Sequence, residues 1–268
     1  QVTGKQPALL GFELLSYSPN INYTDTDDEC MKEVEGNYGT LKRAWEWADK
    51  KGLITFTWHW FSPLGGRSKS FFTVNTDFDV SKSVIDGTPE NIALISDMDM
   101  MAALLRPFCD KQIPILWRPF HEGEGNWFWW GAKGAEPLKK LWRIMYDRYT
   151  NDFGLTNLIW VLGYSGEVKD GWYPGNDYCD IIGSDTYDNS THARAWKKLA
   201  AMETGKPMTF HECGKVPRIP IFERDGAMWS WFMIWHTDHI TGNSVKVLNN
   251  VYNDEKAITL DELPDIYS

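Results

Sequence analysis

The stretch QIPILWRPFHEGEGNWFWWG, residues 112–131, begins as an apolar run and then changes character. Residues 112–120 carry the short, continuous apolar pattern of a buried strand. At its end the chain places Arg118, His121, Glu122 and Glu124 directly before a cluster of aromatic rings. A buried strand that releases ionisable groups only at its carboxyl end is typical of the active-site face of an α/β barrel.

The same pattern repeats along the chain. The sequence predicts strands at residues 7–14, 53–60, 112–120, 157–163, 180–185, 206–212 and 229–236, and helices at 40–52, 89–106, 137–152 and 192–204. A short strand near Ile21 would raise the number of strands to eight. Because strands and helices alternate, we predict a parallel sheet with right-handed crossovers. The length favours an α/β fold of the (β/α)8 TIM barrel type, with residues 1–268 as a single domain. A doubly wound open sheet is the second choice, since no glycine-rich loop follows the first strand.

The composition narrows the class of ligand. The 268 residues have a formal net charge of −10, which argues against a nucleic acid, because such a partner needs a basic face. Aromatic residues make up 15% of the chain, and flat rings can stack on a neutral ligand as well as fill a core. No apolar run is long enough to span a bilayer. We expect a monomer that binds a neutral or cationic ligand.

The cysteines and histidines form no recognisable metal site. Cys30, Cys109, Cys179 and Cys213 are widely scattered and are predicted to be unpaired thiols. There is no HExxH helix, and neighbouring His and Glu side chains of an extended chain point to opposite sides. No GxSxG turn for a nucleophilic serine is present. The sequence therefore predicts neither a metal nor a cofactor.

Two glutamates stand out among the polar residues at strand ends. Taken alone, His59 is better explained as a packing residue, and Arg118 is equally well explained by a structural ion pair. Glu122 and Glu212 are harder to explain in that way, because a glutamate at the end of a buried strand is unfavourable without a partner or a task. Two carboxyl groups in an aromatic cleft are what glycoside hydrolysis requires.

Residues 118–131, RPFHEGEGNWFWWG, resemble the acid/base signature of glycoside hydrolase family 26, the β-mannanase family of the retaining (β/α)8 clan. Other segments look like family features in the family's order: WHW at 58–60, WYPG at 172–175, the Asp185–Tyr187 pair, Glu212 at a strand end, and LDELP at 260–264. The resemblance extends over nearly the whole chain.

The resemblance implies a retaining mechanism. Glu122 would be the acid/base, and Glu212 would be the nucleophile that forms a glycosyl-enzyme. Tyr187 would donate a hydrogen bond to Glu212, and His121 would lie beside the acid/base. In the clan the acid/base follows the fourth strand and the nucleophile the seventh, and a retaining pair has carboxyl groups about 5 to 5.5 Å apart.

The resemblance also implies a set of substrate contacts. His59 and Trp235 would line subsite −1, and Trp127 would be a sugar platform while Phe128, Trp129 and Trp130 pack beneath it. His236 replaces an arginine that contacts subsite −2 in some members, so the preferred chain length stays open. Glu124 falls at a variable position and is predicted to be a solvated loop residue or a rim contact. The full predicted set is His59, Arg118, Trp127, Trp172, Asp185, Trp235 and His236.

The implied reaction is cleavage of β-1,4-mannosidic linkages in mannan, galactomannan or glucomannan. Mixed-linkage β-glucan and β-1,3-xylan stay open as alternatives, because the family contains enzymes for both. A polymer substrate implies a secreted, periplasmic or cell-surface location, although no signal-peptide pattern begins at Gln1. A non-catalytic carbohydrate-binding protein is the remaining alternative; such a protein has no need of a carboxylate pair.

Overall fold

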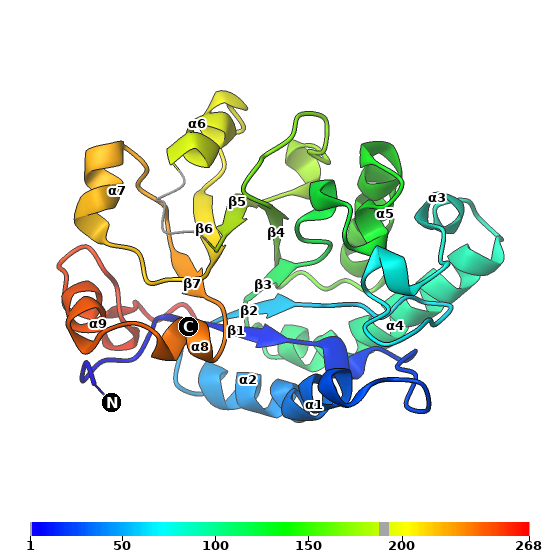
Figure 1. The fold of residues 1–268 in the computed structure, drawn as a ribbon, viewed down its shortest axis with the longest axis horizontal. Helices are drawn as coiled ribbons and strands as arrows, with labels where there is room; N and C mark the ends of the chain where they lie inside the picture. Colours follow the sequence, from blue (N-terminus) through cyan, green and yellow to red (C-terminus); the bar gives the residue numbers. More distant parts are fainter. Residues whose placement is uncertain (1, 188–192, 268) are drawn as a thin grey trace.

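Seven parallel strands form the centre of the molecule in a computed structural model that describes residues 2–187 and 193–267. They lie side by side in chain order, so that each strand pairs with the next along the sequence (Figure 1). Their bounds are β1 Leu9–Glu13, β2 Leu53–Thr57, β3 Ile115–Arg118, β4 Leu158–Tyr164, β5 Ile181–Thr186, β6 Met208–Cys213 and β7 Phe232–Ile234.

The sheet curves into a nearly closed barrel. β1 approaches β7, and Gly11 permits this because a Cβ there would lie 2.3 Å from the sulfur of Met233. A cavity of about 1240 Å³ follows the gap between these two strands. The predicted (β/α)8 barrel class is confirmed, and the doubly wound alternative is wrong, because an open sheet of that kind does not keep its strands in chain order.

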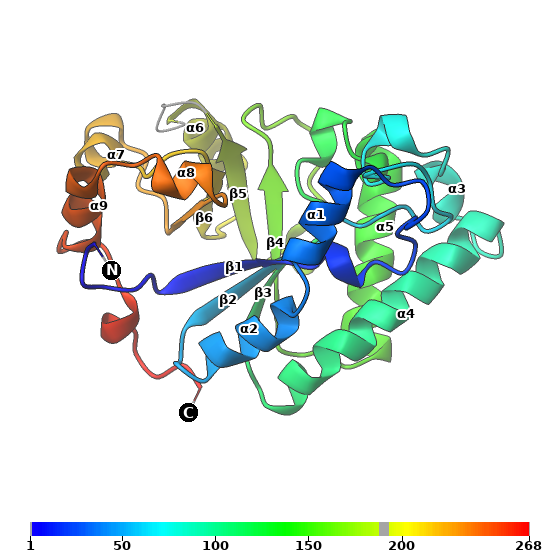
Figure 2. The ribbon, with the colours of Figure 1, turned by 60° about the horizontal axis from the view of Figure 1, so that its bottom comes forward.

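Helices surround the strands (Figure 2). The longer ones are α1 Asp28–Gly36, α2 Thr40–Ala48, α4 Pro89–Asp110, α5 Ala135–Asp147, α6 Ala193–Ala201, α7 Ile219–Asp225 and α9 Val245–Tyr252, and α3 Val80–Ser83 and α8 Asp238–Thr241 are single turns. α5 buries Leu138, Leu141, Trp142 and Met145, which lie on one face at helical spacing. Four of the helices were predicted from such spacing, and their ends differ by a few residues. His192, the first residue of the fourth predicted helix, lies outside the described residues.

The strand expected near Ile21 is not present. After a 3-10 turn at Leu15–Tyr17 the chain is irregular, and the Asn22 side chain accepts hydrogen bonds from the backbone of Thr24 (3.2 Å) and Asp25 (3.1 Å). Such a local turn competes with strand pairing. Glu122 therefore follows the third observed strand and Glu212 lies on the sixth, where the fourth and seventh had been expected.

Aromatic side chains fill much of the space between the strands and the helices. Seven tryptophans are among the largest fully buried side chains: Trp58, Trp60, Trp117, Trp129, Trp130, Trp142 and Trp160. The cysteines are free thiols, as predicted. Within the described residues, no helix is both long enough and apolar enough to cross a membrane.

Candidate active site

The loop after β3 holds Glu122 in an unusual backbone conformation. Glu122 has φ +52°, a left-handed value that is unfavourable for a residue with a side chain. Its N–H donates to the carbonyl of Gly163 on β4 at 2.7 Å. Gly131 packs closely against this loop, since a Cβ at position 131 would lie 1.9 Å from the carbonyl oxygen of Gly123. The backbone of the candidate acid/base is therefore fixed by tertiary contacts.

The environment of the Glu122 side chain favours its protonated form. Burial raises the pKa of Glu122 to about 7, and the nearby negative charge of Glu212 acts in the same direction. The charge of Arg118 and a hydrogen bond from Trp127 Nε1 to Glu122 Oε2, 3.1 Å long, oppose the shift without cancelling it. A carboxyl group of this pKa can donate a proton near neutral pH.

Glu212 lies on β6 in a different environment. Its Oε2 lies 3.1 Å from Arg118 Nη1, and the hydroxyl of Tyr187 donates a hydrogen bond to Oε1. The Glu212 side chain is 5% exposed. One carboxyl group thus has a cation and a hydroxyl donor beside it, whereas Glu122 has neither in contact, and such a contrast separates the roles of two acids.

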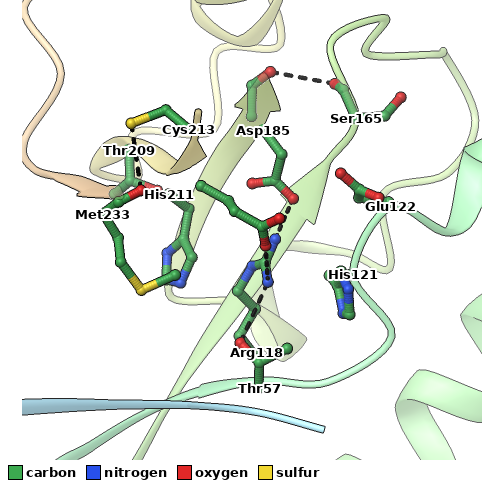
Figure 3. A network of polar contacts seen from close by, with 12 residues as sticks. Thr57, Arg118, His121, Glu122, Ser165, Asp185, Thr209, His211, Cys213 and Met233 are labelled. Atoms are coloured by element: carbon green, nitrogen blue, oxygen red, sulfur yellow. Dashed lines mark hydrogen bonds and ion pairs between the residues drawn. The ribbon is translucent and has the colours of Figure 1, made fainter. Parts of the chain in front are cut away.

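Arg118 connects the strands at the centre of the site (Figure 3). Its Nη2 donates to Asp185 on β5, and its Nη1 lies 3.3 Å from the hydroxyl of Thr57 on β2. Burial lowers the pKa of Arg118, but the charges of Asp185 and Glu212 raise it more, so the guanidinium stays charged. Arg118 and Asp185 were predicted as substrate contacts, and that role stays a prediction; in the structure both side chains are 0% exposed. Both side chains lie behind Glu212, where Arg118 supplies the positive charge beside this carboxylate and Asp185 pairs with the same guanidinium.

Replacing Arg118 with methionine is expected to destabilise the fold by about 3 to 5 kcal/mol, because two carboxylates then stay buried without their cation. The measurement is urea unfolding at neutral pH. Arg224→Met serves as the control, since that arginine is 70% exposed and pairs with its neighbour Asp225 at the surface. A variant of Arg118 as stable as the parent protein would contradict the assignment.

Two histidines lie together at the mouth of the barrel. The rings of His59 and His121 are 4.6 Å apart, and His59 Nδ1 lies 2.8 Å from Glu13 Oε2. Burial lowers the pKa of His59, but the charge of Glu13 and the hydrogen bond to it raise the pKa more. His121 has no such partner, and burial together with Arg118 holds its pKa well below the usual value. We infer a charged His59 beside a neutral His121 in mildly acidic solution.

The predicted aromatic contacts divide into two groups. Trp127 is 42% exposed and bonded to Glu122, whereas Phe128, Trp129 and Trp130 are buried, as expected. Trp235 is partly exposed and its ring lies 5.8 Å from that of His59. The exposed His236 lies next to it, 5.2 Å away between ring centres. Trp172 is partly buried and packs against the main hydrophobic core.

Glu124 differs from its prediction. The residue is 2% exposed, and its Oε1 accepts hydrogen bonds from the backbone N–H of Ser165 (2.6 Å) and from the Ser165 hydroxyl (2.7 Å). The interpretation as a solvated loop residue is therefore wrong. Two flanking glycines suggested a flexible, exposed loop, and nothing local indicated that the end of β4 would cover this carboxylate. The contact between Glu13, near the end of the first predicted strand, and His59 was not predicted, for the same reason.

His211 and Glu212 are neighbours in the sequence, but their side chains contact different groups. His211 Nε2 lies 3.4 Å from the hydroxyl of Thr55, whereas Glu212 faces Arg118. Burial and the charge of Arg118 hold the pKa of His211 well below its usual value. Over residues 2–187 and 193–267, no three His, Cys, Asp or Glu side chains are grouped so that they could hold a metal ion.

Several known proteins are similar to this chain in sequence. A mannan endo-1,4-β-mannosidase of Thermothelomyces thermophilus is 35% identical over 98% of this chain and 55% of its own length. Mannan endo-1,4-β-mannosidase B of Piromyces is 30% identical over 98% of the chain and 45% of its length. The chain thus spans about half the length of these curated relatives.

Solved structures give the same result. The GH26-CBM35 β-(1,4)-mannanase of Podospora anserina superposes with a TM-score of 0.88 at 35% identity, over 100% of this chain and 61% of that one. A β-mannanase from a symbiotic protist of the termite Reticulitermes speratus, complexed with gluco-manno-oligosaccharide, gives a TM-score of 0.86 at 31% identity, over 99% and 83%. The family model described as glycosyl hydrolase family 26 matches residues 1–262. With sequence and barrel in agreement, the chain belongs to glycosyl hydrolase family 26.

Proposed function

We propose that the chain is a retaining endo-β-1,4-mannanase module that cleaves mannan, galactomannan or glucomannan. The observation that carries this proposal is the unequal pair of carboxyl groups. The pKa of Glu122 is raised to about 7, so this carboxyl group can carry a proton near neutral pH, while Glu212 lies against the guanidinium of Arg118 and accepts a hydrogen bond from Tyr187. Double displacement at an anomeric carbon requires one acid and one nucleophile of this kind.

In the first step, Glu212 attacks the anomeric carbon while Glu122 gives its proton to the glycosidic oxygen, so that the C–O bond breaks and a glycosyl-enzyme forms. In the second step, the ionised Glu122 takes a proton from water, the water oxygen attacks the same carbon, and Glu212 leaves. Tyr187 holds Oε1 of Glu212 in place throughout, and the neutral His121 adds no charge beside the acid. The reaction uses neither a metal nor a cofactor.

The aromatic residues supply the sugar contacts in this proposal. Trp127 lies beside the acid/base, on the side of the leaving group, and its exposed face stacks on a sugar ring. Trp235 and His59 form the floor and wall of subsite −1, and His236 extends it toward subsite −2. Trp172 is kept as a weaker, more distant contact.

The relatives support the substrate class. Those named above are called mannan endo-1,4-β-mannosidases, and one solved neighbour is described with a bound gluco-manno-oligosaccharide. We further propose that the chain is one monomeric catalytic domain, and that it acts outside the cytoplasm, because an intact polymer does not enter a cell.

The test is a panel of polysaccharides with the release of reducing ends as the readout. We expect cleavage of mannan, glucomannan and galactomannan, and little release from mixed-linkage β-glucan or β-1,3-xylan. Proton NMR of the first products checks the mechanism, since retention gives the β-anomer before mutarotation. Preference for a different polymer would replace the substrate assignment, and binding without any new reducing ends would indicate a carbohydrate-binding protein.

A further inference from the structure

The buried carboxylate of Glu124 has no part in the two steps above. It lies two residues after the acid/base in the same loop, and its 2% exposure keeps it away from any substrate. Burial raises the pKa of Glu124, while the bonds from Ser165 oppose that shift. A buried acid without a task is unfavourable, so its contacts indicate what it does.

The contacts of Glu124 join the loop to the end of β4. The backbone N–H of Glu122 donates to the carbonyl oxygen of Gly163. Two residues later in both segments, Glu124 Oε1 accepts hydrogen bonds from the backbone N–H and the hydroxyl of Ser165. Glu122 and Glu124, on the two sides of Gly123, are therefore anchored to β4 and to the residue that directly follows it. Lys169 adds a bond from its Nζ to the carbonyl oxygen of Glu124 at 2.8 Å.

Ser165 also connects the loop to the opposite side of the site. Its carbonyl oxygen accepts a hydrogen bond from the hydroxyl of Ser184 at 3.2 Å, drawn as the dashed line at Ser165 in Figure 3. Ser184 precedes Asp185, which pairs with Arg118, and Arg118 in turn contacts the nucleophile. One chain of bonds therefore links the loop of Glu122 to the support of Glu212.

From this geometry we propose that Glu124 is a positioning residue, which fixes the acid/base Glu122 by anchoring its loop to Ser165. The anchor is needed because Glu122 has φ +52°, a conformation that the loop would leave if it were free. Misplacement of a reacting group by about 1 Å can reduce a rate on the order of 10²-fold. The inference rests on the proposed function, since it assigns a role within that reaction.

The test compares two substrates that differ in their need for a proton. Mannan has a poor leaving group and requires the acid, whereas an aryl β-mannobioside with a dinitrophenolate leaving group does not. For Glu124→Ala we expect kcat/KM on mannan to fall on the order of 10- to 10²-fold, while kcat/KM on the aryl substrate stays near the parent value. Glu124→Gln should recover most of the loss, because an amide oxygen can accept the same two bonds. Glu136→Gln, a surface change on α5, is the matched control.

Each outcome decides between positioning and a structural role. An equal fall on both substrates, or a Gln variant as poor as the Ala variant, would overturn the proposal. If the Ala variant does not fold, Ser165→Ala removes only the hydroxyl donor, and it must still affect mannan more than the aryl substrate. A parent protein that cleaves neither substrate refutes the proposed function itself, whereas an active parent with a uniform loss in the variants refutes only the role of Glu124.

Discussion

Replacing Glu212 with alanine is expected to abolish the cleavage of mannan, with a fall in kcat on the order of 10⁵-fold or more, because the covalent step loses its nucleophile. A good leaving group should not restore the activity, since the missing group is the one that attacks carbon. The measurement is the release of reducing ends from mannan and of phenolate from an aryl β-mannobioside.

The Glu212 variant must be shown to be folded, because its side chain neutralises part of the charge of Arg118. Asp185 still pairs with that arginine in the variant, so we expect a cooperative unfolding transition like that of the parent. Glu212→Gln is the matched variant, since it keeps an acceptor for the Tyr187 hydroxyl while removing the nucleophile. Turnover close to that of the parent in either variant would refute the assignment of Glu212.

Replacing Glu122 with alanine is expected to separate the two substrates. Loss of a general acid typically reduces the rate by about 10²- to 10⁴-fold, and we expect a loss of that size in kcat/KM on mannan. On the aryl substrate kcat/KM should be nearly retained, while kcat and KM fall together because the glycosyl-enzyme lacks its base and accumulates. Equal losses of kcat/KM on both substrates would contradict the acid/base role.

The pH dependence gives a second test of Glu122. Its pKa is raised to about 7, and only the protonated form can donate. The kcat/KM of the parent on mannan should therefore decline as the pH rises above about 7, and this limb should be absent in Glu122→Ala with the aryl substrate. Because a raised pKa also means that ionised Glu122 disfavours the folded state above that pH, the alanine variant should be no less stable in alkaline solution. If kcat/KM of Glu122→Ala still declined above about pH 7, the decline would be due to the ionisation of another group.

Several features of the fold could be predicted because they depend on neighbouring residues in the chain. The continuous apolar character of residues 112–120 predicts a buried strand. The helical spacing of apolar residues within 137–152 predicts the buried face of α5. The strand predicted near Ile21 is absent for a local reason. Asn22 there forms a turn, which a short apolar pattern does not reveal.

The candidate site was predicted only in part. Position at strand ends placed Glu122 and Glu212 on one face, and the resemblance supplied their roles. Burial could not be foreseen in the same way: Arg118 and Asp185 were expected in the cleft but form a buried pair between residues 67 positions apart. Glu124 was expected in solvent and is covered by Ser165, 41 positions away.

By itself the sequence determined the alternation of strands and helices, the barrel class, and the two glutamates that lie on its carboxyl face, because periodicity and strand ends are properties of local segments. The tertiary structure decided which charges meet. Glu212 has Arg118 and Tyr187 in contact, whereas burial raises the pKa of Glu122, which has no cation in contact, and this difference supports the proposed roles of nucleophile and acid. The free energy of a charge depends on the groups and the solvent around it, and those are set only when distant strands come together.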